Sequence, residues 1–232
     1  AMSGLRKFSQ KGEPVFQSYH STWDPDGLNF FPSGSVGIPP VMAAYLAHAY
    51  RFAEEHGYKV PADAHFWSLI GDSEFREGSL YEAMPDAAER EIGNLTWIVD
   101  YNRQSLDGHR ITNRQIMNGT DDMRIERTST ANGWEVIQVR HGRKRLAAFK
   151  KPDGALLRNV IENGFDDYEF QSLLGSRDDE KIKKALVEKD PKLKKFLSTL
   201  KNGEAFELFS DLGGHDMGEV IASEIGHRQL TE

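Results

Sequence analysis

The chain has no cysteine, no long apolar run and no repeated or low-complexity segment. Without cysteine it has no disulfide, no thiolate metal site and no cysteine nucleophile. No stretch approaches the roughly 20 consecutive apolar residues of a membrane helix, and no signal peptide is recognisable, so we expect no membrane partner and a cytoplasmic location. Positive charge is scarce as well. The 29 Lys and Arg residues are outnumbered by 36 Asp and Glu, and the net charge of −7 argues against a nucleic-acid partner.

Two short apolar runs are present, Phe66–Ile70 and Leu95–Val99. They predict buried strands, because a parallel strand that is covered on both faces is apolar throughout rather than alternating. The residues between them, 78–92, predict a helix, and a strand–helix–strand unit is typical of an α/β sheet. The sequence therefore predicts two parallel strands with a helical crossover.

Three further elements frame this unit. Apolar residues at helical spacing predict a helix from Ile38 that Gly57 ends, with Pro39 and Pro40 in its first turn, where their missing N–H groups cost nothing. Pro85 predicts a kink, or two short helices in place of one, because proline removes a hydrogen bond from a helix interior. The two short helices are expected at Gly78–Ala83 and Asp86–Ile92. A third strand is predicted at Trp134–Val139.

Oxygen-bearing side chains follow both apolar runs. Asp72 comes directly after the first run, and Asn102 and Gln104 follow the second. In open α/β sheets, ligands bind outside the carboxyl ends of the strands. Oxygen ligands of this kind suit Mg²⁺, whose coordination is usually completed by substrate phosphates. The residues therefore predict a Mg²⁺–diphosphate site, although Asp72 and Asn102 would also serve simply to cap the turns that follow.

The same positions carry a family resemblance. Gly71-Asp72-Ser73, followed by Asn102 thirty residues after the aspartate, resembles the thiamine diphosphate motif, in which Gly-Asp-Gly precedes a downstream Asn. The resemblance is strongest to the homodimeric bacterial pyruvate dehydrogenase, the decarboxylating first component of that complex. It extends over nearly the whole chain, but over only part of that family's longer polypeptide. The segments that carry it are 5–8, 31–37, 71–74, 100–108 and 213–216.

This resemblance implies the cofactors thiamine diphosphate and Mg²⁺, bound in a doubly wound, mostly parallel sheet with helices on both faces. The implied metal ligands are Asp72, Asn102 and Gln104. No catalytic residue is assigned. Tyr19, which stands where the family has a tyrosine near the cofactor, and His141, at the carboxyl end of the expected third strand, are candidates. The implied cofactor-binding residues are Gly34, Ser35, Val36, Gly71, Asp72, Ser73, Glu74 and Asn102.

Two positions depart from the family pattern. Ser73 replaces a glycine that allows close approach of the backbone to a phosphate, so its side chain either crowds the phosphate or donates a hydrogen bond to it. Asp100 stands where the family often has asparagine, and it adds negative charge beside a diphosphate, which Mg²⁺ partly offsets. Both substitutions leave open whether the cofactor still binds.

Four regions are expected along the chain: an irregular arm over 1–35, the core of the diphosphate-binding domain over 36–141, a charged helical insertion over 142–212, and a return to the α/β domain over 213–232. By resemblance, the family chain continues beyond both ends, so the α/β domain is expected to be incomplete. The insertion favours the pyruvate dehydrogenase branch over transketolase-like relatives, in which the third strand runs almost directly into a Gly-His-Asp turn.

The function implied is that of the thiamine diphosphate and Mg²⁺-binding portion of a 2-oxo acid dehydrogenase. The glutamate that activates the cofactor belongs to a separate pyrimidine-binding domain, which has no counterpart in this chain. We therefore expect the chain alone to be inactive, with that domain supplied by the same longer chain or by another subunit, and a homodimer in the intact enzyme. Two alternatives remain: a transketolase-type enzyme, and a non-catalytic binding or assembly module that has lost cofactor affinity.

Overall fold

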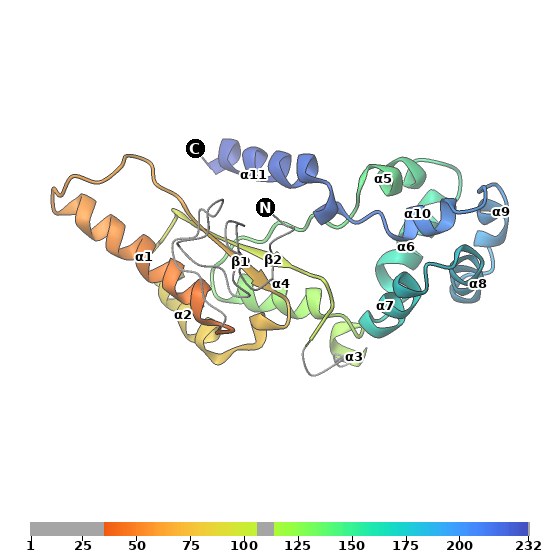
Figure 1. Cartoon of the computed structure of the whole chain (residues 1–232), viewed down its shortest axis with the longest axis horizontal. Helices are drawn as coiled ribbons and strands as arrows, with labels where there is room; N and C mark the ends of the chain where they lie inside the picture. Colours follow the sequence, from red (N-terminus) through yellow and green to blue (C-terminus); the bar gives the residue numbers. More distant parts are fainter. Residues whose placement is uncertain (1–34, 106–113, 232) are drawn as a thin grey trace, which may run out of the picture. The chain divides into compact units, whose positions relative to one another are not determined.

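The computed structural model describes residues 35–105 and 114–231 (Figure 1). The chain divides into two compact units. The sheet unit comprises Ala1–Asn102 and Thr128–Trp134, and the helical unit comprises Arg103–Arg127 and Glu135–Glu232. The structure is a mixed α/β one, with a short parallel sheet and many helices.

Two parallel strands form the sheet, β1 (Phe66–Gly71) and β2 (Leu95–Asp100), which lie side by side in Figure 1. Phe66 pairs with Leu95 and Gly71 with Asp100, so the strands are in register over six residues. Both predicted strands are confirmed, each extended by one residue at its carboxyl end. The parallel pairing is possible because α2 (Gly78–Glu89) provides the crossover between them.

The two faces of this sheet differ in burial among the described residues, and helices on both faces stay a prediction. On one face Ile70 is fully buried and Leu95 is 9% exposed, whereas on the other Leu69 is 71% exposed and Ile98 is 37% exposed. The buried face packs on the first helix of the chain and on α2. Within the part of the chain that the structure describes, α1 and α2 therefore cover one face of these strands. The buried cluster on that face comprises Ala44, Ala47, Ala87 and Leu95.

That first helix, α1 (Ile38–Glu55), begins and ends as predicted. Pro39 and Pro40 occupy its first turn, and Gly37 is the N-cap residue with φ of +85°. Beyond the last turn, Gly57 adopts a φ of +76°, the left-handed conformation that commonly ends a helix. Local sequence pattern was sufficient for this element.

The helix α2 continues through Pro85, so the predicted break into two short helices is wrong. Leu80 and Met84 are fully buried on one side of α2, together with Ala83 and Ala87. An interior proline costs about 3 kcal/mol, and burial of several apolar side chains is of comparable size. Packing of the apolar side of α2 therefore preserves one helix across the proline.

The predicted third strand at Trp134–Val139 is also wrong, since these residues have no strand structure. The ring of Trp134 lies 4.3 Å from the ring of Trp97, and its Nε1 donates to the carbonyl of Met84 at 2.8 Å. Further along, His141 forms an isolated antiparallel bridge with Leu212. Trp134 therefore packs on β2 through Trp97, whereas Ile137 of the same segment is 45% exposed.

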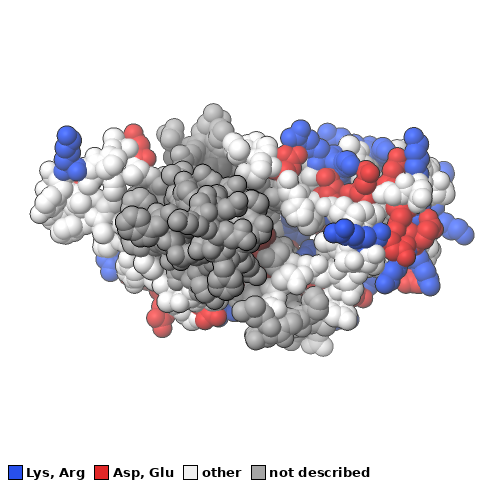
Figure 2. All heavy atoms as spheres, viewed as in Figure 1, with Lys and Arg blue, Asp and Glu red and all other residues white. Residues whose placement is uncertain are grey.

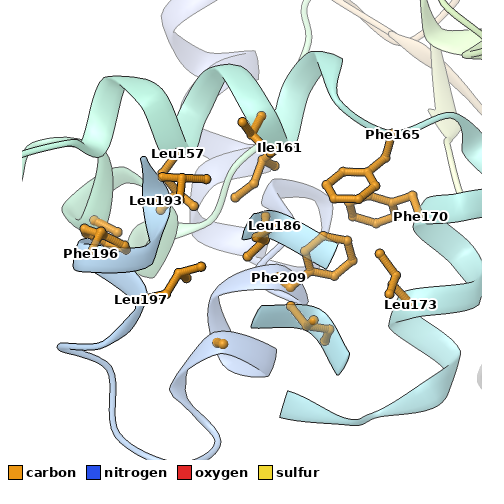
Figure 3. Close-up of a cluster of buried hydrophobic side chains, with 14 residues drawn as sticks. Leu157, Ile161, Phe165, Phe170, Leu173, Leu186, Leu193, Phe196, Leu197 and Phe209 are labelled. Atoms are coloured by element: carbon orange, nitrogen blue, oxygen red, sulfur yellow. The ribbon is translucent and has the colours of Figure 1, made fainter. Parts of the chain in front are cut away.

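The helical unit is built from short helices around one closed core. Figure 3 shows the rings of Phe165, Phe170 and Phe209 close together in this core. The ring centroids of Phe170 and Phe209 are 4.4 Å apart in a stacked arrangement. The predicted change to short charged helices after Gly142 is observed. The helices that contribute to the core are α5 (Arg143–Phe149), α6 (Gly154–Asn163), α7 (Asp167–Ser176), α8 (Asp179–Lys189), α9 (Leu193–Leu197) and α10 (Glu204–Phe209).

The surface of this unit mixes charges of both signs. Figure 2 shows Lys and Arg interspersed with Asp and Glu over the helices of the unit. Lys183 pairs with Asp179 at 2.8 Å, and Lys189 pairs with Glu169 at 3.0 Å. Lys183 and Lys189 of the charged helical region therefore have acidic partners on the same surface.

The remaining elements are short or terminal. Two of them, α3 (Arg114–Met117) and α4 (Asp121–Ala131), precede the Trp134 segment. The 3-10 turn η3 (Gly213–His215) leads into α11 (Met217–Thr231), where the Asp216 side chain accepts from the N–H groups of Gly218 and Glu219 and so caps the start of the helix. Among the described helices, none has the length and apolar character needed to cross a bilayer.

Candidate functional site

The carboxyl ends of β1 and β2 bring Asp72 and Asn102 to one peptide group. The backbone N–H of Asp72 donates to the carbonyl oxygen of Asp100 at 3.2 Å, and the backbone N–H of Asn102 donates to the same oxygen at 3.0 Å. Because Gly71 is paired with Asp100, this shared acceptor lies at the end of the paired region. Two of the predicted metal ligands therefore lie at one edge of the sheet.

The side chains at this edge are held by short local contacts. Asp72 is buried, at 4% exposure, and its Oδ1 accepts from the N–H of Ser73 at 2.9 Å. The exposed Asn102 donates from Nδ2 to Oδ2 of Asp100 at 3.0 Å. This contact engages the amide nitrogen of Asn102, so any metal contact of this side chain is made by its carbonyl oxygen. Asp100 thus orients the asparagine as well as adding charge.

The donor set suits a hard cation completed by ligand oxygens. Within the parts of the chain that the structure describes, no three His, Asp or Glu residues come together as a metal-binding group. The predicted site is of another kind, since it offers one carboxylate from Asp72 and one amide oxygen from Asn102. Mg²⁺ typically takes one or two carboxylates and completes its shell with water and phosphate oxygens. Gln104 belongs to the helical unit, and its role as a third ligand stays a prediction.

A second loop, at the start of α1, is tied to this edge by Glu74. The N–H of Gly37 donates to Oε1 of Glu74 at 2.7 Å, and the N–H of Gly71 donates to Oε2 at 3.2 Å. Ser35 and Val36, two of the residues implied to contact the cofactor, are exposed in this loop. The loop and the Gly71–Ser73 motif therefore share one carboxylate. Gly34 and Tyr19 lie outside the described residues.

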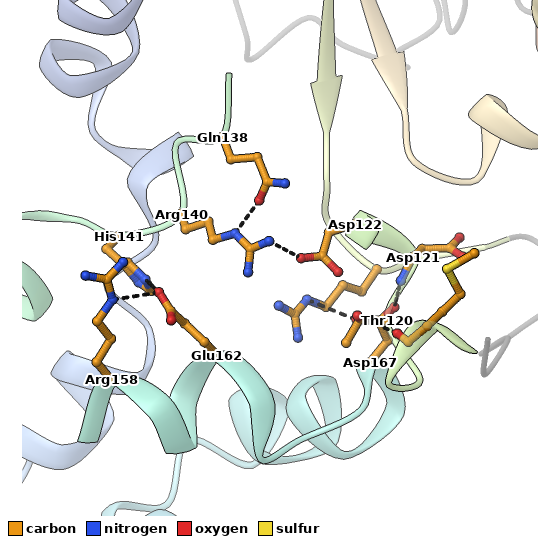
Figure 4. A network of polar contacts seen from close by, with 11 residues as sticks. Thr120, Asp121, Asp122, Gln138, Arg140, His141, Arg158, Glu162 and Asp167 are labelled. Atoms are coloured by element: carbon orange, nitrogen blue, oxygen red, sulfur yellow. Dashed lines mark hydrogen bonds and ion pairs between the residues drawn. The ribbon is translucent and has the colours of Figure 1, made fainter. Parts of the chain in front are cut away.

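His141, the other catalytic candidate, lies in a polar cluster of the helical unit (Figure 4). Its Nε2 donates to Oε1 of Glu162 at 2.8 Å, while Nη1 of Arg145 donates to its Nδ1 at 3.4 Å. Arg158 donates to the same Glu162 oxygen at 2.9 Å. The imidazole edge also meets the ring of Phe149. Both ring nitrogens of His141 therefore have partners within the helical unit, and a catalytic role for it stays a prediction.

Burial is the largest single influence on the pKa values of His141, Arg145 and Glu162. It lowers the pKa of His141, against the hydrogen bond to Glu162, which raises it. Burial also lowers the pKa of Arg145 to about 10, helped by the nearby guanidinium of Arg103. For Glu162, burial raises the pKa, but hydrogen bonds from His141 and Arg158 together bring it below its ordinary value. Arg145 thus stays charged at neutral pH.

Two residues of the sheet-edge region were not singled out from the sequence. Ser79 donates from Oγ to the carbonyl of Gly37 at 3.0 Å, and Gly37 itself supplies the N–H that Glu74 holds. Gly37 directly precedes a helix that opens with two prolines, and glycine is the residue that tolerates the left-handed φ observed there. Ser79 lies 42 positions away from its partner, and no local pattern predicts that contact.

Comparison with known proteins gives the class to which this fold and site belong. Residues 33–152, more than half of the chain, match the transketolase family's thiamine diphosphate binding domain. The match includes Asp72, Asn102 and the loop before α1. The chain therefore belongs to this family of thiamine diphosphate-binding domains.

Within that class, the chain is similar to pyruvate dehydrogenase E1 components. It is 31% identical over 194 residues to that of Corynebacterium glutamicum, a match covering 83% of this chain and 20% of the relative. The corresponding protein of Mycolicibacterium smegmatis is 29% identical, and the match covers 83% of this chain and 20% of that protein. The Escherichia coli K12 protein is 26% identical, and the match covers 83% of this chain and 21% of that protein. The chain thus spans about a fifth of the length of these relatives.

Proposed function

We propose that this chain is the Mg²⁺ and thiamine diphosphate-binding portion of a pyruvate dehydrogenase-type enzyme. One observation carries the proposal: Asp72 and Asn102 meet at the Asp100 carbonyl, at the carboxyl ends of adjacent parallel strands. This is the edge at which open α/β sheets bind their ligands. The family match over residues 33–152 supports the identity of the cofactor.

Each residue of the edge has a distinct task in this proposal. The buried carboxylate of Asp72 and the carbonyl oxygen of Asn102 hold Mg²⁺, with Gln104 as the third protein ligand. We assign to the hydroxyl of the half-buried Ser73 a hydrogen bond to a phosphate oxygen. Ser35 and Val36 lie against the thiamine rings. Asp100 contributes negative charge, and its contact with the Asn102 amide orients that ligand toward the metal.

The reaction requires more than this chain. Bound thiamine diphosphate supplies the electron sink for decarboxylation of a 2-oxo acid. The residues of this chain bind and orient the diphosphate end, and a pyrimidine-binding domain from elsewhere in a longer chain or from another subunit completes the site, in a homodimeric enzyme. We expect the 232-residue chain alone to show no decarboxylation of pyruvate; turnover by the isolated chain would contradict this part of the proposal.

The same proposal accounts for the exposed apolar side chains on one face of the sheet in the part of the chain that the structure describes. In a doubly wound sheet, helices cover both faces, and strands are apolar on both sides for that reason. Trp67 and Leu69 of β1 are 46% and 71% exposed in this chain. We infer that in the complete enzyme these side chains are covered, and that β1 and β2 belong to a larger doubly wound sheet.

The alternatives make different predictions. A transketolase-type enzyme would share the metal edge, but the relatives described above are pyruvate dehydrogenase E1 components and favour the first assignment. A module that has lost cofactor affinity would keep the fold and bind nothing. The extra carboxylate of Asp100, which is exposed beside Asn102, is the feature that favours this second alternative.

Binding of the cofactor tests the proposal directly. Titration of the chain with thiamine diphosphate in the presence of Mg²⁺ is followed by calorimetry and by tryptophan fluorescence, because Trp67 and Trp97 lie on β1 and β2. We expect saturable binding that depends on Mg²⁺. Absence of binding would overturn the proposal and leave the non-catalytic module.

The variant Asp72→Asn identifies the metal edge as the binding site. Loss of this carboxylate is expected to weaken Mg²⁺-dependent binding by about 100-fold or more, because even residues that only support metal ligands cost 10- to 100-fold when removed. Asp86→Asn is the matched control, since Asp86 pairs with Arg90 on the surface of α2. Equal losses in both variants would show that charge alone, not the site, governs binding.

A further inference from the structure

Glu74 makes two contacts that tie separate loops together. Its Oε1 accepts from the N–H of Gly37 at 2.7 Å, and its Oε2 accepts from the N–H of Gly71 at 3.2 Å. Gly37 caps α1, whereas Gly71 is the last residue of β1 and directly precedes Asp72. One carboxylate therefore joins positions that are 34 residues apart in the sequence.

Gly37 is held through its carbonyl oxygen as well as through its N–H group. Ser79 donates from Oγ to the Gly37 carbonyl at 3.0 Å. No larger residue fits there, because a Cβ at Gly37 would lie 2.6 Å from Cβ of Glu77 and 2.9 Å from Oγ of Ser79. The φ of +85° also disfavours any residue with a side chain. The backbone before α1 is thus fixed closely against the turn that follows β1.

The position of Glu74 is fixed by its own element. It opens the 3-10 turn η2 (Glu74–Arg76), whose next residue, Phe75, is only 2% exposed. The Phe75 ring meets Tyr81 of α2 edge-on at 6.5 Å. Because Phe75 is buried, the turn cannot rotate without exposing it. The carboxylate of Glu74 is therefore presented to both backbone N–H groups by a rigid turn.

We propose that Glu74 is a positioning residue, which holds the Ser35–Gly37 loop in place against the Asp72 motif. The inference rests on the proposed function, since the loop is taken to contact the thiamine rings and the motif to hold the metal. It replaces the expectation that Glu74 contacts the cofactor directly. The carboxylate fixes the distance between the two parts of the cofactor site, and hydrogen bonds that involve a charged group are strong enough to do so.

The proposal predicts different effects on the binding of two ligands, whereas a direct contact of Glu74 with the cofactor predicts the same effect on both. Pyrophosphate with Mg²⁺ needs the metal edge alone, whereas thiamine diphosphate needs both the edge and the loop. Loss of a residue that positions the loop against the edge therefore weakens the binding of thiamine diphosphate and leaves the binding of Mg²⁺–pyrophosphate unchanged. A carboxylate that touched the metal or the diphosphate would affect both ligands alike, and so would a general loss of stability.

The test uses the full chain with Glu74→Gln, which keeps the shape and one acceptor oxygen but turns an amide toward the other N–H. We expect hydrogen exchange of the Gly37 amide, followed by NMR, to accelerate about tenfold, and thiamine diphosphate affinity to fall about tenfold, as for loss of one hydrogen bond to a charged group. Affinity for Mg²⁺–pyrophosphate is expected to stay near the wild-type value. Glu82→Gln, an exposed glutamate of α2, is the control and should change none of these quantities.

Two results would overturn the inference: unchanged exchange at Gly37, or an equal loss of affinity for both ligands. If the wild-type chain binds neither ligand, the proposed function fails. Hydrogen exchange at Gly37 then tests by itself whether Glu74 holds the loop. Faster exchange in the variant supports this positioning role, and equal exchange rejects it. If Glu74→Gln does not fold, Glu74→Asp replaces it, because the shorter side chain keeps the charge but withdraws the carboxylate from the N–H groups of Gly37 and Gly71.

Discussion

The sheet unit and the helical unit differ in how completely each buries its apolar residues. Among the described residues, the helical unit joins the apolar sides of six helices in one buried cluster, whereas the sheet unit buries one face of β1 and β2 against α1 and α2. The sheet unit also leaves Leu69 71% exposed on a strand. Yet the sheet unit carries Asp72, Asn102 and Glu74. The residues with a proposed function therefore lie in the unit that leaves apolar side chains of one strand face exposed among the described residues.

This contrast has a physical basis. The short helices of the helical unit close their apolar sides around a common centre. The starts of α7 and α8 are capped by the side chains of Asp166 and Asp178, and Asp166 forms a reciprocal pair with Glu169. A parallel strand pair needs cover on both faces before its apolar side chains are buried. In this chain, α1 and α2 cover one of those faces. Four substitutions or conditions test how far the two units differ.

The largest effect is expected from Phe209→Ala in the helical core. Phe209 is 1% exposed and packs on Phe165 and Phe170, so its truncation should lower the free energy of unfolding by about 3–5 kcal/mol. Urea unfolding measures the loss, and hydrogen exchange with mass spectrometry assigns it to a unit. Leu69→Ala, on the exposed strand face, should change stability by less than about 0.5 kcal/mol. Equal loss of protection in both units would show that they unfold together.

The next largest loss of stability is expected from Gly37→Ala, which changes the sheet unit. A left-handed backbone costs a residue with a side chain about 1–2 kcal/mol, and the new Cβ would also overlap Glu77 and Ser79. Gly57→Ala is the matched control, because Gly57 has a similar φ of +76° with open space around it. Chemical denaturation should show a larger loss for Gly37→Ala. Identical losses of stability in the two variants would mean that the neighbours of Gly37 move aside for the new Cβ without measurable cost.

Asp166→Ala removes the capping box of α7 and should cost about 1 kcal/mol. Asp166 accepts from the Glu169 N–H at 2.8 Å and also pairs with Arg114. Asp178→Ala, at the more exposed start of α8, removes a simpler cap and should cost less. Thermal unfolding compares the two variants. A larger loss for Asp178→Ala would argue against the reciprocal cap as a main support of the helical unit.

The smallest expected effect is a dependence on pH that belongs to His141. Burial places its pKa below the ordinary value of 6.5. As the pH falls through 6.5, the unfolded chain takes up a proton at this position before the folded chain does, so stability decreases, and the loss is complete once the pH is below the folded pKa. The difference in unfolding free energy between pH 7.5 and 5.5 should therefore be smaller in His141→Gln than in the wild type.

Arg145, Arg158 and Glu162 surround the imidazole of His141 and remain in the His141→Gln variant. Glu162 has a lowered pKa, so its own contribution to stability is lost only at lower pH, as the carboxylate becomes protonated in the folded state. An unchanged pH dependence in the variant would show that other histidines account for it. The comparison thus assigns any acid sensitivity of the helical unit to one buried side chain.

Local pattern determined much of this protein in advance. The limits of α1 followed from its apolar spacing, its two prolines and Gly57, and both strands followed from short apolar runs. The order of Asp72 and Asn102 after those runs was enough to predict one edge of a sheet. Each of these features depends on residues within about one turn or one strand of each other, where propensity and spacing are informative.

Only the tertiary structure decided the rest. Burial of the apolar side of α2 kept one helix across Pro85, and Trp134 packed on Trp97 where a third strand was expected. The contact of Glu74 with Gly37 joins residues 37 positions apart, which no local spacing encodes. The physical reason is the same in each case: packing and hydrogen bonds between distant segments are of the same size as local preferences, and they override those preferences wherever the folded chain brings such segments together.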